Sequence, residues 1–375
     1  MLKNNILLPV RGRKTSDYLG NAGLYMKQRT KTLILHIGLH KTGTSSIQAT
    51  LAANRDLLYG RGLLFPAFLP ANHSLFFYNA FSERAENYHA NLRLGCSKDD
   101  IRKTADQQLA KLQKAIADFK GPTILLSGED ACTLRPQEVL SVRRKLDQLA
   151  QGLIYRILLY TRHPVEFASS AIQENVKGNG MTVEDSKALR ITNTVGKIGK
   201  IYDAWADAFG DEAIEFRSFE TTRSADGGLI GSFFSTLGIP VDGLQIHHAN
   251  SGNCDEVTKF LSSLYQTSPG QKQGRKTSIR LTDKDRQVLF ALKGSKGRLL
   301  TPEEQMQVWE NARSDLQFLE DRFSISYRAP APDGTGQTHM FSEDFFQQLA
   351  TALPSLSVNT RKALLDFLLQ RHSHS

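Results

Sequence analysis

The stretch LILHIGLHKTGTSSIQATL, residues 33–51, constrains the fold of this chain more than any other segment. Its apolar run from Leu33 to Gly38 predicts a buried strand, and the apolar spacing over 44–58 predicts a helix. A short glycine-containing loop joins the two. Such an arrangement points several backbone N–H groups and the positive end of a helix dipole at one place. The segment therefore predicts a binding site for an anion such as phosphate.

The loop also concentrates side chains that bind phosphate. Gly38 and Gly43 let the backbone approach a ligand closely, and Lys41 adds a mobile positive charge. The other polar side chains of the loop and the first helical turn are His40, Thr42, Thr44, Ser45 and Ser46. So many donors directly after a buried strand favour a phosphate cradle over a plain helix N-terminus beside a chance lysine.

The position of the lysine distinguishes this loop from that of a nucleotide triphosphatase. A Walker motif, G-x-x-x-x-G-K-[ST], places its lysine after the second glycine, whereas Lys41 precedes Gly43. The segment LLSGED lacks the uninterrupted apolar run expected before a magnesium-binding aspartate, so we interpret Asp130 as a helix N-cap. We expect no metal site. ATP-dependent phosphoryl transfer of the kinase type remains the alternative.

Buried strands alternate with amphipathic helices along much of the chain. Strands are predicted over 33–38, 123–127, 154–160 and 213–220. Helices are predicted over 98–119, 139–150, 165–177, 194–209 and 228–239. This alternation predicts an α/β fold in three layers, with a parallel β-sheet flanked by helices. The chain after residue 280 reads as mostly helical.

Composition suggests four regions along the chain. Residues 1–30 form a basic N-terminal extension, and 31–328 form the α/β domain with its helical C-terminal part. Residues 329–340, rich in proline and glycine, are a linker candidate. Residues 341–375 are expected to form a helical C-terminal tail.

Charge and cysteine content narrow the class of protein. The net charge of +9 attracts anions, but no recognisable nucleic-acid-binding module is present, so we expect no nucleic-acid partner. The three cysteines show no disulfide or metal-ligand spacing, and no apolar run is long enough for a transmembrane segment. We therefore expect a cytoplasmic protein with free thiols.

The loop HIGLHKTGTSSIQ resembles the 5′-phosphosulfate loop of sulfotransferases that use 3′-phosphoadenosine-5′-phosphosulfate (PAPS). It is most similar to the bacterial and carbohydrate-type members, whose loops read K-T-G-T-[ST]-[ST]. The resemblance implies the P-loop-like sulfotransferase fold. It also implies a second motif that binds the 3′-phosphate: an arginine at a strand end and, eight residues later, a serine on the next helix, with a proline between.

The segment LLYTRHPVEFASSAIQE supplies that second motif as Arg162, Pro164 and Ser170. An arginine at the end of a strand can direct its forked guanidinium onto phosphate oxygens. A proline suits the first turn of a helix, and Ser170 lies about two turns into it. The two motifs together cover about 33–177. Arg275 and Lys276 resemble a basic loop that closes over the 3′-phosphate in some members.

The resemblance implies transfer of a sulfonate group from PAPS to a hydroxyl or amine, with a carbohydrate as the expected acceptor. Lys41 would neutralise charge that develops on the leaving phosphate. Three residues are candidates for the general base: His73, after the first helix, Glu129, after the second long strand, and His40, within the phosphate loop. We interpret His40 as a residue that lines the cofactor rather than as the base. The sequence favours neither His73 nor Glu129 over the other as the base. A domain that binds a nucleotide or an anionic glycan without catalysis is a further alternative.

Overall fold

Five parallel strands form the central sheet of the computed structural model, which describes residues 30–193, 197–248, 254–266, 281–294, 299–331 and 341–372. The strands are β1 (Thr32–Gly38), β2 (Leu63–Leu64), β3 (Thr123–Ser127), β4 (Ile154–Thr161) and β5 (Ile214–Ser218). Their order across the sheet is β2-β3-β1-β4-β5. The predicted α/β fold with a parallel sheet is therefore confirmed.

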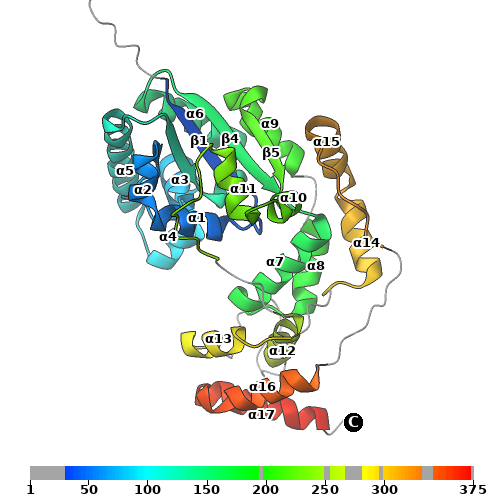
Figure 1. The fold of residues 1–375 in the computed structure, drawn as a ribbon. Coiled ribbons are helices and arrows are strands. Elements are labelled where there is room, and N and C mark those ends of the chain that lie inside the picture. The colour runs from blue at the N-terminus through cyan, green and yellow to red at the C-terminus, as the bar shows by residue number, and fades with distance from the viewer. Residues whose placement is uncertain are drawn as a thin grey trace, which may run out of the picture.

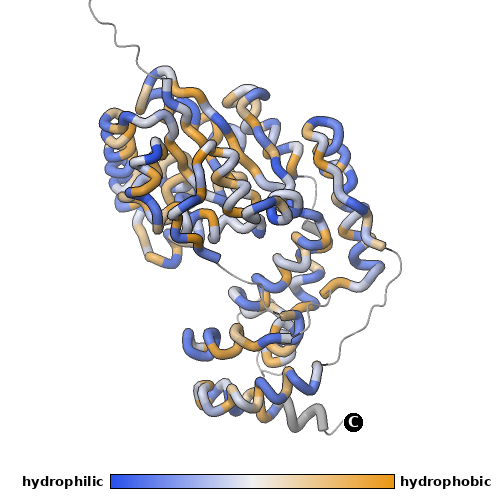
Figure 2. Tube along the Cα trace, viewed as in Figure 1, coloured by the Kyte–Doolittle hydropathy of each residue, from blue (hydrophilic) through white to orange (hydrophobic). Residues whose placement is uncertain are grey.

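The strands are apolar on both faces because helices cover both faces (Figure 1). Along β1, Leu33, Leu35 and Ile37 enter one hydrophobic core, whereas Ile34 enters the core on the opposite face. This alternation follows from the two-residue period of a strand. Figure 2 shows the contrast between the hydrophobic strands and the largely hydrophilic outer helix α5 (Lys98–Asp118).

Two groups of helices complete the three layers. One face of the sheet packs against α3 (Ser74–Phe81), α5, α6 (Pro136–Leu149) and α9 (Ile198–Phe209). The other face packs against α1 (Thr44–Ala53), α2 (Arg55–Gly60) and α11 (Gly228–Thr236). Shorter elements are η1 (Ala85–Asn87), α4 (His89–Leu94), η2 (Glu129–Thr133), η3 (Asp211–Ala213) and α10 (Phe219–Ser224).

A second, wholly helical core lies beside the sheet. It includes α7 (Pro164–Asn179), α8 (Val183–Asn193), α12 (Asp255–Gln266), α13 (Asp283–Phe290), α14 (Pro302–Asn311), α16 (Glu343–Ala352) and α17 (Val358–His372). Figure 1 shows α7 and α8 between the sheet and the last helices. The prediction of a mostly helical C-terminal part is confirmed.

Two features tie the C-terminal part to the rest of the chain. Phe345 and Leu349 of α16 pack in the same core as Phe260 of α12. Leu319 of α15 (Arg313–Phe323) packs instead in the core of the sheet. The proposed N-terminal extension lies outside the described residues except for Thr30, and most of the proposed linker lies outside them too.

The structure corrects several predicted element boundaries. The helix predicted over 44–58 is broken at Asn54, whose amide donates to the Thr50 carbonyl at 2.7 Å. The helix predicted from 194 begins at Ile198, and α8 before it was not predicted. Asp130 is not a helix N-cap: it lies within η2, whose N-cap is Gly128. A short 3₁₀ helix leaves no periodic apolar signal from which it could be predicted.

Within the described residues, no helix combines the length and the apolar character needed to cross a membrane.

Candidate active site

The strand order brings three strand ends together at one edge of the sheet. β1 lies between β3 and β4, with His36 opposite both Ser127 and Leu158. Because all three strands are parallel, their carboxyl ends meet at the same edge, where open α/β sheets bind ligands. The loop with Lys41, the segment with Glu129 and the motif that begins at Arg162 all start there.

The loop after β1 is a tight turn that the glycines make possible. Gly38 has φ 92°, and a Cβ atom there would lie 3.0 Å from the Glu129 backbone. Gly43 has φ 78°, and a Cβ atom there would lie 2.2 Å from Cδ2 of Leu229. The Thr42 hydroxyl donates to the Leu39 carbonyl at 2.5 Å and closes the turn. Both glycines are therefore required for close approach.

The loop leads directly into α1, whose N-cap is Gly43. The first N–H groups of a helix lack the usual partner four residues back. The Ser46 N–H donates to the Gly43 carbonyl at 3.0 Å, and the N–H groups before it are placed to donate to an anion. The Thr44 hydroxyl donates to the Glu129 carboxylate, Ser45 is exposed, and Ser46 is buried. The hydroxyls of this turn therefore differ in accessibility, which the sequence alone did not distinguish.

Lys41 itself adopts a left-handed backbone conformation, with φ 63°. Its Nζ lies 3.3 Å from Oε2 of Glu174, on α7. Glu174 follows Ser170 by one helical turn, and residues four apart share a helix face. Ser170, which is half-buried, therefore lies on the side of α7 that the Lys41 ammonium approaches.

Arg162 joins the two motifs directly. Its Nη1 donates to the Lys41 carbonyl at 2.8 Å, and its guanidinium lies over the ring of Phe219. The side chain is only 16% exposed, and burial lowers the pKa of Arg162. Within the described part of the chain, its Nε is buried and has no hydrogen-bond partner. A cation with a buried, unpaired donor is suited to bind an anion.

The two candidate bases have different surroundings. His73 is fully buried, accepts from the Ser127 N–H at 3.0 Å and stacks on Phe65. Burial, with a smaller contribution from the nearby Arg55, lowers the pKa of His73 to about 3. Glu129 is half-buried beside the loop and accepts from Thr44.

A histidine and a carboxylate also pair at this edge. Nε2 of His40 lies 3.3 Å from Oδ1 of Asp130, and the Tyr88 hydroxyl donates to Oδ2 of Asp130 at 2.5 Å. His40 was predicted to line the cofactor, and Asp130 was predicted to be a helix N-cap with no chemical role. The pairing could not be found from spacing, because it joins two different strand–loop connections.

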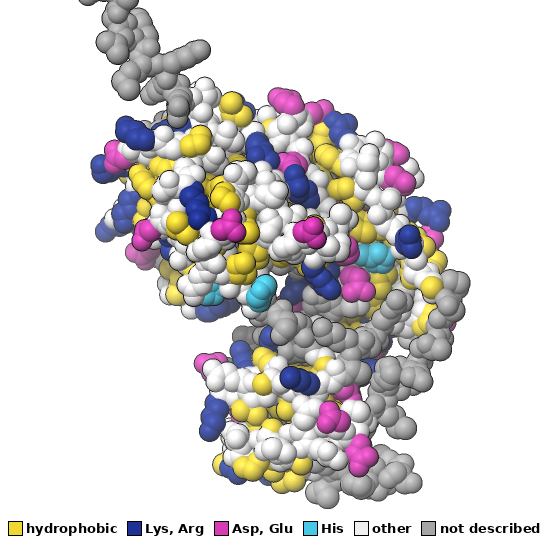
Figure 3. All heavy atoms as spheres, viewed as in Figure 1, with side chains coloured by type: hydrophobic (Ala, Val, Ile, Leu, Met, Phe, Trp, Pro, Cys, Tyr) yellow, Lys and Arg dark blue, Asp and Glu magenta, His cyan; other side chains and the backbone are white. Residues whose placement is uncertain are grey.

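A cleft of about 700 Å³ opens beside these groups and is lined by His40, Thr42 and Arg162. Its walls are mostly apolar, and besides Arg162 they carry the basic residues Arg190, Lys197 and Lys200 and the acidic residues Asp203, Asp207 and Asp315. The apolar residues include Leu134, Pro136, Phe167, Ile198, Ile201 and Leu316. Lys197 and Lys200 were not predicted from the sequence, because these lysines at the start of α9 belong to no recognisable motif. Figure 3 shows basic and histidine side chains on the rim of the hollow between the sheet and the helical part.

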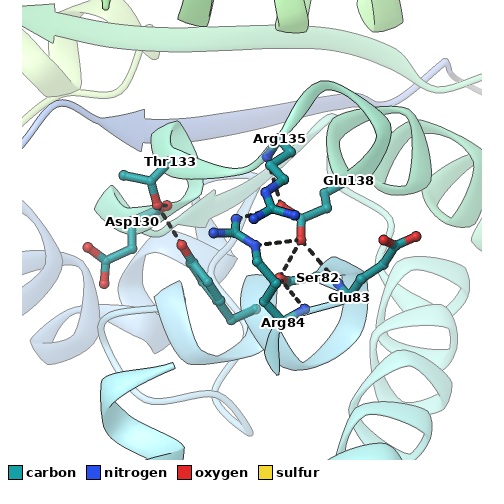
Figure 4. A network of polar contacts seen from close by, with 8 residues as sticks. Ser82, Glu83, Arg84, Asp130, Thr133, Arg135 and Glu138 are labelled. Carbon is teal, nitrogen blue, oxygen red and sulfur yellow. Dashed lines mark hydrogen bonds and ion pairs between the residues drawn. The ribbon is translucent and has the colours of Figure 1, made fainter. Parts of the chain in front are cut away.

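A smaller hollow of about 340 Å³ is lined by Tyr88, Asp130 and Arg84. Beside it, Arg84 forms an ion pair with buried Glu138 at 2.9 Å (Figure 4). Glu138 also accepts from Ser82 and from the Arg135 N–H. This network anchors the segment between α3 and η1 to the start of α6.

Two predicted cofactor residues, Arg275 and Lys276, lie outside the described residues. Among the residues that are described, no group of three or more His, Cys, Asp or Glu side chains could hold a metal ion.

Comparisons with known proteins give matches only at the level of structure. No protein-family model matches this sequence. None of the curated proteins matches it either. A solved sulfotransferase from Alicyclobacillus acidocaldarius matches 62% of this chain and 92% of its own, at 18% identity and a TM-score of 0.38. The sulfotransferase domain from the curacin biosynthetic pathway matches 69% of this chain and 95% of its own, at 14% identity and a TM-score of 0.34.

Both of these solved structures carry the name of the family that the loop motifs resemble.

Proposed function

We propose that this protein is a PAPS-dependent sulfotransferase. The observation that carries the proposal is the contact between the two anion-binding motifs: Arg162 donates to the backbone carbonyl of Lys41 at 2.8 Å. Two phosphate-binding elements side by side fit a ligand with phosphates at both ends of one nucleoside. PAPS, with a 5′-phosphosulfate and a 3′-phosphate, is such a ligand.

The proposed donor contacts follow from the geometry. The N–H groups of Gly43, Thr44 and Ser45 would hold the 5′-phosphate together with the exposed Ser45 hydroxyl, whereas the Ser46 N–H donates to the Gly43 carbonyl. Arg162 and Ser170 would hold the 3′-phosphate, with the buried Nε of Arg162 as a donor that awaits an acceptor. We also propose that Arg275 and Lys276 bind the 3′-phosphate.

Lys41 is proposed to stabilise the charge that develops when the sulfonate leaves. In the structure its Nζ pairs with Glu174, which is 57% exposed, so this ion pair is weak and easily exchanged. Moving to the bridging oxygen between phosphate and sulfonate would place the ammonium where negative charge grows. Electrostatic stabilisation of this kind typically contributes the largest single part of catalysis.

Glu129 fits the general-base role better than His73. A base must reach the acceptor hydroxyl or amine, and His73 is fully buried with Nδ1 already engaged by the Ser127 N–H. Glu129 lies at the loop, but one of its oxygens is engaged by Thr44. We therefore propose a structural role for His73, which supports the end of β3 through its bond with the Ser127 N–H.

The acceptor is proposed to occupy the 700 Å³ cleft. The lining combines the basic side chains of Arg190, Lys197 and Lys200 with the acidic ones of Asp203, Asp207 and Asp315. This mixture of donors and acceptors supports an acceptor rich in hydroxyl groups, such as a carbohydrate. The apolar walls would equally suit an aromatic acceptor. We therefore propose a screen with radiolabelled PAPS against glucosamine, a glucuronic-acid disaccharide, 4-nitrophenol and decanol.

The free thiols of Cys96, Cys132 and Cys254 support our proposal of a cytoplasmic location.

One observation favours a second candidate function. The Thr44 hydroxyl lies against the Glu129 carboxylate, and a loop hydroxyl beside an acid is how many ATP-dependent enzymes hold Mg²⁺. This keeps phosphoryl transfer from ATP open. A domain that only binds a nucleotide or an anionic glycan is the third candidate.

Ligand-induced stabilisation separates these candidates. Adenosine 3′,5′-bisphosphate should raise the melting temperature in the presence of EDTA, and ATP with Mg²⁺ should leave it nearly unchanged. Adenosine 5′-monophosphate, which lacks the 3′-phosphate, is the matched control ligand and should bind more weakly. Stabilisation by ATP with Mg²⁺ but not by the bisphosphate would refute the sulfotransferase proposal.

A further inference from the structure

We propose that His40 is the residue that removes the proton from the acceptor, and that Asp130 positions it. This inference rests on the proposed function, since it names a proton acceptor for that reaction. It starts from the 3.3 Å approach of Nε2 of His40 to Oδ1 of Asp130. The role differs from simple contact with the donor, which is what the sequence predicted for His40.

The pairing determines which nitrogen of His40 can act. An ionised carboxylate can only accept a hydrogen bond, so the tautomer that this contact favours carries its proton on Nε2, facing Asp130. The neutral ring then has its lone pair at Nδ1. This is the arrangement by which a carboxylate holds a catalytic imidazole in its basic tautomer.

Asp130 is itself fixed from several directions. The Tyr88 hydroxyl donates to Oδ2 at 2.5 Å, and the Asp130 N–H donates to the Ser74 hydroxyl at 3.1 Å. The Asp130 carbonyl accepts from the Thr133 hydroxyl at 2.7 Å. Tyr88 in turn stacks on Tyr78, with ring centroids 4.1 Å apart. A carboxylate held this firmly can orient an imidazole whose side chain is 40% exposed.

The location of His40 suits proton transfer. It lines the 700 Å³ cleft that we assign to the acceptor, and it precedes Lys41 in the loop that we assign to the phosphosulfate. An acceptor in the cleft would therefore meet the imidazole beside the bond that breaks. Glu129, by contrast, accepts a hydrogen bond from the Thr44 hydroxyl. This bond suits Glu129 to position the first turn of α1.

The proposed step balances as follows. A lone pair of the acceptor oxygen or nitrogen forms the new bond to sulfur, while its proton passes to Nδ1 of His40. The bond between sulfur and the bridging phosphate oxygen breaks, and its electron pair leaves with adenosine 3′,5′-bisphosphate. The imidazolium that forms is stabilised by Asp130 and later loses its proton to solvent at the mouth of the cleft.

Kinetics of His40→Ala test the proposal, with transfer from [³⁵S]PAPS to the best acceptor of the screen, or to water if none is sulfonated. We expect kcat to fall by roughly 100-fold or more, which is typical for loss of a general base. The KM for PAPS and the stabilisation by the bisphosphate should stay within about twofold. Added imidazole should restore part of the activity, because the cleft can admit it. Glu129→Ala should not respond to imidazole.

A double-mutant cycle tests the role of Asp130. Asp130→Ala should lower kcat on its own but have no further effect in the His40→Ala background, because it acts through His40. Asp118→Ala, an exposed carboxylate on α5 paired with Lys114, is the control and should leave kcat unchanged. A purely structural role for Asp130 would give additive losses and lower melting temperatures.

The results separate this inference from the proposed function. If the bisphosphate fails to stabilise the wild-type protein, the sulfotransferase proposal itself fails. If it stabilises wild type and His40→Ala equally, but His40→Ala keeps its kcat, only this inference is overturned. A rise in the KM for PAPS with kcat unchanged would also overturn it, because His40 would then merely contact the donor.

Discussion

Arg162 and Lys41 are 121 residues apart in the chain, yet Nη1 of Arg162 donates to the Lys41 carbonyl at 2.8 Å. The contact bridges the ends of β4 and β1, which are neighbours in the sheet. It fixes the guanidinium against the turn that carries Lys41, so the two anion-binding motifs form one continuous surface. The proposed function depends on this relationship more than on either motif alone.

Arg162→Lys should therefore weaken binding of adenosine 3′,5′-bisphosphate. A lysine has no planar fork, so it cannot keep the bond to the Lys41 carbonyl and also bind a phosphate in the same geometry. We expect the Kd from calorimetry to rise by roughly 10- to 100-fold, which corresponds to about 1.4–2.8 kcal/mol. Arg143→Lys, which alters an arginine paired with Asp147 on α6, is the matched control. Equal Kd values for the two variants would contradict the assignment.

Lys41→Ala should impair chemistry far more than donor binding. Loss of one preorganised stabiliser of developing charge typically lowers kcat by roughly 10²- to 10³-fold. Stabilisation by the bisphosphate should largely persist, because the backbone N–H groups of α1 remain. Lys114→Ala, on the exposed face of α5, serves as the control. Transfer of ³⁵S at the wild-type rate would show that Lys41 has no catalytic role.

Gly43→Ala should destabilise the protein more than Gly95→Ala does. Both glycines have positive φ, 78° and 65°, which costs an L-residue roughly 1 kcal/mol. A Cβ atom at 95 meets no atom within 4 Å, whereas one at 43 would lie 2.2 Å from Leu229. The difference in unfolding free energy between the variants should therefore report the steric term, roughly 1–3 kcal/mol. Chemical denaturation measures both, and equal losses would show that Leu229 moves aside freely.

Glu138 should make the protein sensitive to acid. Burial alone would raise the pKa of Glu138, but hydrogen bonds from Arg84, the Arg135 N–H and Ser82 outweigh it and lower that pKa to about 2. Because the folded pKa lies below the unfolded value of 4.5, the stabilisation is complete above pH 4.5. It is lost as the pH falls towards 2 and amounts to roughly 3 kcal/mol. Urea unfolding of Glu138→Gln should be less pH-dependent in this window.

His36 should lower the unfolding free energy as the pH falls from about 6.5 to 4, a window above that of Glu138. It is fully buried against Ser127, and burial lowers the pKa of His36 from 6.5 to about 4. The unfolded state therefore binds a proton first, and the unfolding free energy falls as the pH drops from about 6.5 to 4. The loss is roughly 3 kcal/mol. His36→Gln, which keeps a polar partner for Ser127 but does not titrate, should flatten this part of the profile.

Local features of the sequence were sufficient to predict much of the framework. The runs at 33–38, 123–127 and 154–160 are apolar on both faces, because both faces of a parallel sheet are covered, and they became β1, β3 and β4. The loop at Lys41 and the start of α7 could be predicted because glycine alone readily adopts positive φ, whereas the proline ring fixes φ at a helical value. The break at Asn54 had no such signal.

The tertiary structure alone decided which side chains meet. The order β3-β1-β4 places Glu129, Lys41 and Arg162 at one edge, and no spacing along the chain encodes that order. Burial removed His73 from contact with solvent, and its Nδ1 accepts from the N–H of Ser127, 54 residues away in the chain. The pairing of His40 with Asp130 likewise joins two strand–loop connections. Sequence thus specified the local elements and their chemistry, whereas long-range packing determined their combination into a site.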